Sequence, residues 1–257
     1  MQKPVKPLAP TLCLVTGGSG LIGSAIARRL AADGASVLVH YNENRVDADD
    51  VVHTIVAAGG VAQTVQADLG ATNGAMSLIA KLDAAFDGRY AGRLDVLINN
   101  AGTFGFSHLS DLDDDEFDRV FTINVRAPFQ LAREASRRMT RAGWGRIVNI
   151  GSVFGQAAPA AGMSAYCGSK FALAGLTRAW SRDLGGAGIT VNAVQPALIQ
   201  AEPFPTDGPA FEAMRRFVSV DRFGRGDDVA EAVAYLTDPK TSFVNGVCLN
   251  VDGGWSA

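Results

Sequence analysis

Cysteine, clustered basic residues and long apolar runs are all scarce in this sequence of 257 residues. The three cysteines, Cys13, Cys167 and Cys248, are odd in number and far apart, which argues against a disulfide framework or a zinc site and favours a reducing, cytoplasmic setting. The net charge of -3 comes without a lysine or arginine cluster, so a nucleic-acid partner is not expected. Because no stretch approaches the roughly 18 apolar residues of a spanning helix, we expect no membrane association.

Histidine is equally scarce. His40, His53 and His108 are dispersed along the chain, and none has a partner at the spacing of metal ligands. No metal site is therefore expected, and the three histidines are interpreted as structural or surface residues.

The first ten residues contain three prolines, Lys3 and Lys6, but no apolar core of the kind that a signal peptide needs. We expect residues 1–10 to form a short disordered lead-in. Residues 11–257 show no proline-rich linker, and a hydrophobic content of 47% is enough for one buried core. A single domain is therefore predicted for them.

Short apolar runs alternate with longer segments of helical spacing. The runs are rich in Val, Ile and Leu and predict strands buried on both faces at 11–16, 36–40, 62–67, 96–99, 146–150, 190–195 and 247–251. The helical segments are 24–33, 46–58, 74–86, 114–139, 164–184 and 227–236. Such alternation predicts an α/β fold with a doubly wound, seven-stranded parallel sheet and helices on both faces, of the Rossmann type.

A glycine-rich turn follows the first predicted strand and opens a helix. It reads Thr-Gly-Gly-Ser-Gly-Leu-Ile-Gly and includes Gly17, Ser19, Gly20, Leu21 and Ile22. Backbone N–H groups and the helix dipole at such a turn can face a pyrophosphate. The turn therefore predicts a dinucleotide-binding site.

The end of the second predicted strand bears on which dinucleotide is bound. An acid there would hydrogen-bond the ribose 2'-hydroxyl of NAD, but Tyr41 occupies that position and Asn42 follows it. The absence of an acid there favours NADP, whereas Glu43 is unfavourable for a 2'-phosphate. NADP is the preferred cofactor, and NAD stays possible.

Polar or small residues also follow the third and fourth strands, where open α/β sheets bind ligands. Asp68 and Leu69 come after the third strand, and Asn100, Ala101 and Gly102 after the fourth. Asp68 has an alternative interpretation as the N-cap of the next helix.

Tyr166 and Lys170 lie four residues apart in a helical segment, so their side chains share one helix face. A tyrosine is a poor acid-base group at neutral pH unless a positive charge stabilises its phenolate, and Lys170 would supply that charge. Ser152 ends the fifth predicted strand, where its hydroxyl can donate to a substrate oxygen.

In this order, the glycine turn, the Asn-Asn-Ala-Gly sequence, Ser152 and the Tyr166/Lys170 pair resemble the single-domain short-chain dehydrogenase/reductases over residues 12–255. The resemblance implies that Tyr166 exchanges the proton, that Ser152 polarises the carbonyl, and that Lys170 holds the nicotinamide ribose and lowers the pKa of the tyrosine. It also implies that Asn124 maintains a helix kink and a proton path.

Several positions depart from the pattern of that family. Its second loop glycine aligns with Leu21, the proline-glycine pair after the sixth strand is Pro196-Ala197, and the threonine that reaches the nicotinamide aligns with Ala201. We therefore expect Pro196 and the backbone near Ile199 to contact the nicotinamide end.

The substrate region contains few polar groups, which favours an uncharged or weakly polar ketone. Ser152 and Tyr166, together with Phe154 and Phe204, are predicted to contact this ketone, and residues 200–220 are predicted to form a lid. Arg215 and Arg216 in the predicted lid could contact the phosphate of an acyl carrier or coenzyme, so 3-oxoacyl thioesters stay an alternative substrate class. The leading hypothesis is an NADP(H)-dependent ketone reductase that forms a homotetramer or homodimer. Alternatives are an NAD-dependent alcohol or sugar dehydrogenase, a pteridine reductase, and a dinucleotide sensor without catalytic activity.

Overall fold

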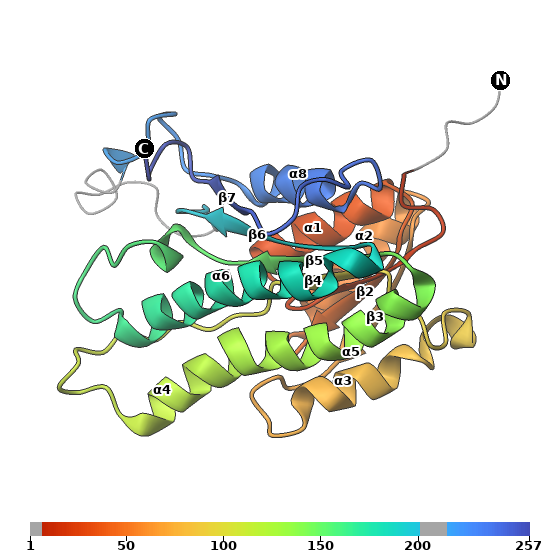
Figure 1. The fold of residues 1–257 in the computed structure, drawn as a ribbon, viewed down its shortest axis with the longest axis horizontal. Coiled ribbons are helices and arrows are strands. Elements are labelled where there is room, and N and C mark those ends of the chain that lie inside the picture. Colours follow the sequence, from red (N-terminus) through yellow and green to blue (C-terminus); the bar gives the residue numbers. More distant parts are fainter. Residues whose placement is uncertain (1–6, 201–214) are drawn as a thin grey trace.

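A seven-stranded sheet forms the centre of the computed structural model, which describes residues 7–200 and 215–257 (Figure 1). Its strands lie in the order β3-β2-β1-β4-β5-β6-β7, and all neighbours pair in parallel. They are β1 (Leu12–Val15), β2 (Ser36–Tyr41), β3 (Val61–Gln66), β4 (Val96–Asn99), β5 (Gly145–Ile150), β6 (Ile189–Pro196) and β7 (Cys248–Val251). The predicted doubly wound sheet is confirmed.

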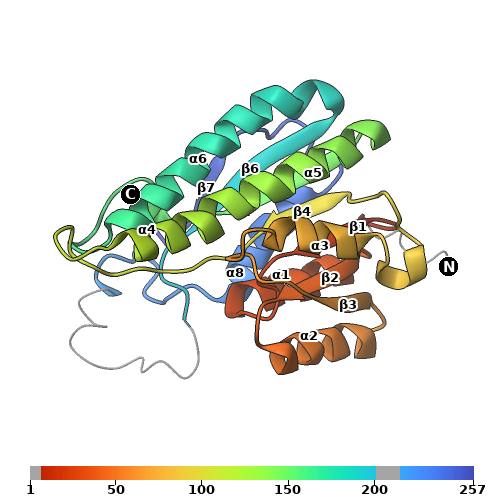
Figure 2. The same ribbon diagram turned by 90° about the horizontal axis from the view of Figure 1, so that it is seen from below.

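Helices cover both faces of the sheet (Figures 1 and 2). One apolar core packs the sheet against α1 (Leu21–Ala32), α2 (Arg45–Ala57) and α8 (Gly226–Thr237). A second core packs the other face against α3 (Gly74–Leu82), α5 (Ala127–Ala142) and the end of α6 (Ser164–Leu184). Along the described chain, no helix combines the length and the hydropathy needed to cross a membrane.

The two edge strands differ from the expectation that all strands are buried on both faces. In β3 exposed and less exposed side chains alternate, and Val61 is 43% exposed. In β7 all residues are partly exposed. Each edge strand pairs on one side only, so neighbouring layers cover it less completely than the five central strands.

The predicted helix 114–139 is helical throughout, but it is not a regular α-helix over its whole length. It consists of α4 (Asp114–Phe121), a π-helical turn (Thr122–Arg126) and α5, with Pro128 in the first turn of α5. The π-helical turn contains Asn124, whose amide bonds outward to another segment. An additional residue in one turn is a common device at functional sites.

The lead-in prediction for residues 1–10 is wrong at Leu8. This side chain is 1% exposed within the core, and its backbone N–H donates to the carbonyl of Asp33 at 3.0 Å. Apolar burial therefore anchors the chain before β1 begins, while residues 1–6 lie outside the described residues.

Candidate active site and cofactor cavity

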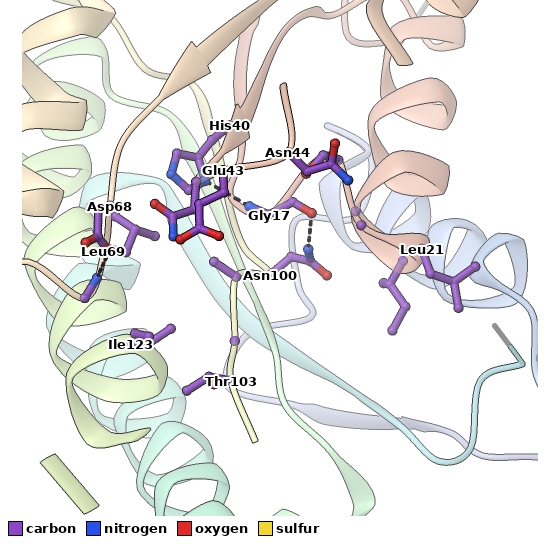
Figure 3. A pocket seen from close by; sticks show the side chains of 18 of the residues that line it. Gly17, Leu21, His40, Glu43, Asn44, Asp68, Leu69, Asn100, Thr103 and Ile123 are labelled. Carbon is purple, nitrogen blue, oxygen red and sulfur yellow. Dashed lines mark hydrogen bonds between the residues drawn. The ribbon is translucent and has the colours of Figure 1, made fainter. Parts of the chain in front are cut away.

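A cavity of about 650 Å³ opens where β1 and β4 meet, which is the point at which the strand order reverses (Figure 3). Open α/β sheets bind ligands at this switch point. The loops after β1, β2, β3 and β4 supply its walls. Most of the predicted cofactor residues line it: Gly17, Ser19, Gly20, Leu21, Ile22, Asn42, Asp68, Leu69, Asn100, Ala101, Gly102 and Ile199.

Glycine is required at two positions of the first loop. Gly17 has a φ of 61°, a conformation that side chains rarely adopt. A Cβ on Gly23 would lie 2.1 Å from the carbonyl oxygen of Gly17, so only glycine lets α1 begin this close to the loop. The start of α1 faces the cavity as a result, which suits a pyrophosphate.

The turn after β4 is bonded directly to the glycine loop. The Asn100 amide donates to the carbonyls of Thr16 and Gly17 at 2.9 and 3.0 Å. In return, the Thr16 hydroxyl accepts the backbone N–H groups of Asn100 and Ala101, both at 2.9 Å. These bonds hold two walls of the cavity in a fixed relation.

Tyr41 is not where the sequence prediction put it. Its side chain is 9% exposed and belongs to the core beneath α1 and α2, whereas Asn42, Glu43 and Asn44 line the cavity. The prediction took the strand position for the side-chain direction, but successive residues of a strand point to opposite faces. Among the described lining residues, the charged ones are Glu43 and Asp68, and none is lysine or arginine.

The alternative role of Asp68 as a helix N-cap is excluded by its position. Asp68 Oδ1 accepts the backbone N–H of Gly70 at 2.8 Å, and the residue that precedes α3 is Asn73. Asp68 therefore shapes the turn after β3 at the cavity wall.

A second cavity of about 260 Å³ adjoins the first, with which it shares Ile22, Asn100, Gly102 and Thr103. Its other walls include three predicted catalytic residues, Ser152, Tyr166 and Lys170, and the predicted cofactor residue Pro196. The sheet edge therefore brings the end of β5, the start of α6 and the end of β6 together, as the order of motifs predicts.

Burial has the largest effect on the pKa values of the two ionisable groups in this second cavity, Tyr166 and Lys170. Burial raises the pKa of Tyr166, and a side-chain hydrogen bond with Ser152 opposes that rise. The net effect is a raised pKa, whereas the sequence predicts that Lys170 lowers it. Lys170 Nζ lies 5.6 Å from the centre of the Tyr166 ring and donates to the carbonyl of Ile150 at 3.0 Å, and burial lowers the pKa of Lys170 to about 8.

Asn124 connects the second cavity to α6. Its Oδ1 accepts the N–H of Thr103 at 2.8 Å, and its Nδ2 donates to the carbonyl of Thr103 at 2.9 Å and to Ser169 Oγ at 3.0 Å. Ser169, which the sequence reasoning missed, donates in turn to the carbonyl of Tyr166 at 2.7 Å. The only signal in the sequence is a serine in the same helical segment, three residues after Tyr166 and next to Lys170.

The predicted substrate contacts need correction. Phe154 does not line the catalytic cavity, and its ring instead packs edge-to-face on Trp255, with 6.2 Å between centroids. Phe104 lines the cavity, and its ring lies 4.6 Å from that of Tyr166. Phe204 and most of the predicted lid at 200–220 lie outside the described residues.

The fold and this site together define the short-chain dehydrogenase/reductases, and the chain belongs to that family. Residues 19–256 match the family model described as enoyl-(acyl carrier protein) reductase. Members of the wider family catalyse oxidation and reduction, so this chain is an oxidoreductase.

Proteins from bacteria and fungi are similar to this chain over nearly its whole length. The cyclic-di-GMP-binding biofilm dispersal mediator protein of Escherichia coli is 39% identical, with 95% of this chain and 96% of the relative covered. A "probable tetrahydroxynaphthalene reductase" of Zymoseptoria tritici is 34% identical, with coverage of 94% and 93%.

Solved structures agree with the fold. A short-chain dehydrogenase/reductase from Serratia marcescens superposes with a TM-score of 0.90 at 36% identity, covering 98% of this chain and 100% of the other. A short chain dehydrogenase from Burkholderia cenocepacia in complex with NADP has a TM-score of 0.87 at 40% identity, covering 96% and 98%.

Proposed function

We propose that this protein is an NADPH-dependent reductase of uncharged, preferably aromatic ketones, with Tyr166 as its acid. The observation that carries the proposal is the convergence of Ser152, Tyr166 and Lys170 in one cavity that is continuous with a dinucleotide-sized cavity. The glycine loop fits a dinucleotide because Gly23 lets α1 begin against the loop, so that the N-terminus of this helix faces the cavity in which a pyrophosphate would lie. Gly17, Ser19 and the start of α1 would hold the pyrophosphate.

Each catalytic side chain has a separate role at the substrate carbonyl. When bound, the nicotinamide supplies the hydride that reaches the carbonyl carbon. Tyr166 donates its proton to the oxygen, and Ser152 donates a hydrogen bond to that oxygen as negative charge develops. Tyr166 carries its proton at neutral pH before the reaction, because its pKa is raised by burial from a value that is already near 10. Lys170 Nζ lies 5.6 Å from the centre of the Tyr166 ring, so as a cation it would attract the negative charge that the phenolate gains in the reaction, and it would also hold the nicotinamide ribose.

NADPH is proposed as the reductant because the Burkholderia cenocepacia structure contains NADP and a related structure from a metagenomic library contains NADPH. The end of β2 carries no acid at Tyr41, but Glu43 faces the cavity (Figure 3). We infer that Glu43 weakens this preference without reversing it, since one carboxylate repels a 2'-phosphate through solvent.

An aromatic substrate is favoured by the wall beside Tyr166. Phe104 is 48% exposed and stacks on Phe106, which is 60% exposed, with 6.3 Å between their centroids and 14° between their planes. A flat substrate would find further aromatic surface there. The name of the Zymoseptoria tritici relative, a reductase of a naphthalene compound, supports the same substrate class.

A screen of NADPH oxidation tests this proposal. Its panel contains aryl ketones, aliphatic ketones, 3-oxoacyl thioesters, enoyl thioesters, quinones, sugars and dihydropteridines. We expect turnover on aryl ketones, with KM raised roughly tenfold by Phe104→Ala because an aromatic contact is lost. Phe154→Ala is the matched control, since that ring lies outside the cavity, and should leave KM unchanged.

The rival functions give other outcomes in that screen. Activity confined to sugars with NAD would favour a dehydrogenase, and activity confined to dihydropteridines would favour a pteridine reductase. Turnover of nothing in the panel, with binding of NADPH or cyclic-di-GMP, would favour a sensor. The complete set Asn124, Ser152, Tyr166 and Lys170 supports an enzyme over a sensor.

A further inference from the structure

His40 is the penultimate residue of β2 and takes no part in the chemistry proposed above. Its side chain is 2% exposed and lines the cofactor cavity. Figure 3 shows it beside Gly17, on the side of the cavity where the Asp68 turn lies. The imidazole therefore stands between the loop that follows β1 and the turn that follows β3.

The two ring nitrogens have different partners, which defines the protonation state. Nδ1 accepts the backbone N–H of Gly17 at 3.0 Å, so this nitrogen carries a lone pair and no proton. Nε2 lies 3.0 Å from the carbonyl oxygen of Ala67, which can only accept, so Nε2 carries the proton. Burial also holds the pKa of this imidazole at about 4, so the ring is neutral at neutral pH.

We propose that His40 is a positioning residue for the cofactor, fixing the Gly17 N–H and the turn after β3 across the cavity through its neutral Nε2–H form. The inference rests on the proposed cofactor binding and adds a residue to it. The backbone strengthens the connection, because the Gly18 N–H donates to the carbonyl of His40 at 2.7 Å.

The bond from Gly17 matters because of the conformation of that residue. With a φ of 61°, Gly17 turns its carbonyl toward the Asn100 amide and its N–H toward His40, so the imidazole completes the bonding of the loop. Without an acceptor, a partly buried N–H loses its partner and the loop can relax. The other end of the ring contacts Ala67, the residue before Asp68, so both cavity walls would shift.

This placement predicts a change in cofactor affinity and not in chemistry, because His40 does not line the catalytic cavity. The three variants His40→Asn, His40→Gln and His40→Phe separate the two bonds. The Asn Oδ1 lies as many bonds from Cα as Nδ1 and can accept from Gly17. The Gln Nε2 matches the ring Nε2 and can donate to Ala67, and Phe keeps the ring shape with neither bond.

Fluorescence titration of each full-length variant with NADPH, together with kcat at saturating NADPH, tests the inference. We expect His40→Phe and His40→Gln to raise Kd about tenfold and His40→Asn to raise it by no more than about threefold, with kcat kept within about twofold throughout. Equal Kd in wild type and His40→Phe, or a loss of kcat with unchanged Kd, would overturn the inference. A wild-type protein that binds no nicotinamide cofactor would instead refute the proposed function.

If the variants do not fold, the protonation state of His40 can still be measured directly on the wild-type protein. Long-range ¹H–¹⁵N correlation spectra at neutral pH should show an unprotonated Nδ1 and a protonated Nε2 for His40. The opposite tautomer or a doubly protonated ring would contradict the hydrogen bonds on which the inference depends.

Discussion

At the scale of single residues, the catalytic cavity contains a cation whose burial opposes folding. Lys170 is 6% exposed and has no carboxylate partner among the hydrogen bonds that it makes in the described structure. A charge placed there is retained because the proposed reaction needs it, and a stability cost at a functional site is common.

Replacing Lys170 with methionine should therefore stabilise the protein while abolishing turnover. Its pKa is lowered from 10.5 to about 8, so the folded state binds the proton less tightly than the unfolded state. Burial of the charged Lys170 therefore lowers the free energy of unfolding by about 3 kcal/mol below pH 8, and this penalty disappears as the pH rises through 10.5. The variant also loses the hydrogen bond to the carbonyl of Ile150, which offsets part of the benefit. We expect the free energy of unfolding to rise by about 1–3 kcal/mol.

Urea denaturation at neutral and alkaline pH checks this expectation, with Lys240→Met, an exposed site, as the control variant. The gain from Lys170→Met should be largest at neutral pH and shrink at higher pH. A loss of stability at neutral pH, or a gain that grows with pH, would disagree with the burial argument.

Glu43 provides a second residue-scale prediction. Glu43→Gln removes a negative charge from the cavity wall near the proposed 2'-phosphate, so we expect NADPH to bind roughly fivefold more tightly and NADH to be little affected. Titration of the wild-type and variant proteins with NADPH and with NADH gives the ratio of the two dissociation constants for each protein. Asp50→Asn, on the exposed face of α2, controls for net charge. An unchanged NADPH/NADH ratio would place the phosphate elsewhere.

At the scale of elements, apolar runs and helical spacing predicted most of the fold. The predicted ranges 96–99 and 164–184 coincide with β4 and α6, and the other strands begin and end within two residues of their predicted bounds. Buried parallel strands leave this signal because they need continuous apolar residues. The same alternation of strands and helices also predicted which edge of the sheet carries the cofactor loops.

The failures at this scale occur where tertiary contacts override local pattern. The turn 122–126 departs from regular α-helix where Asn124 bonds to Thr103, a partner that is distant in the sequence and invisible in helical spacing. Tyr41 and Phe154 were assigned by their positions after strands, but their side chains turn into the core and toward Trp255. From the sequence, His40 is interpreted as a structural or surface residue, because its hydrogen-bond partners Gly17 and Ala67 are distant in the sequence.

At the scale of the whole molecule, exposed aromatic side chains suggest how copies associate. Phe117, Phe129 and Phe171, on α4, α5 and α6, are each 41–47% exposed, and a groove between α5 and α6 is lined by Phe129 and Trp180. Apolar surface of this kind on one side of the molecule marks protein interfaces. We propose that these helices form the interface of a homodimer or homotetramer.

Light scattering should give a mass of about 54 or 108 kDa, two or four times the 26.9 kDa of one chain. Phe129→Glu combined with Phe171→Glu should lower that mass, whereas Val56→Glu, at an exposed site on α2, should not. A wild-type mass near that of one chain at micromolar concentration would rule out the proposal.

The central claim is that Tyr166 donates the proton to a carbonyl reduced by bound NADPH. The most direct test compares wild-type and Tyr166→Phe proteins for NADPH oxidation on the best aryl ketone and for NADPH affinity. We predict that kcat falls by about 10²- to 10⁴-fold while Kd for NADPH stays within about twofold, because a proton donor is lost and no phosphate contact changes. Retention of more than about a tenth of the wild-type kcat would contradict the account.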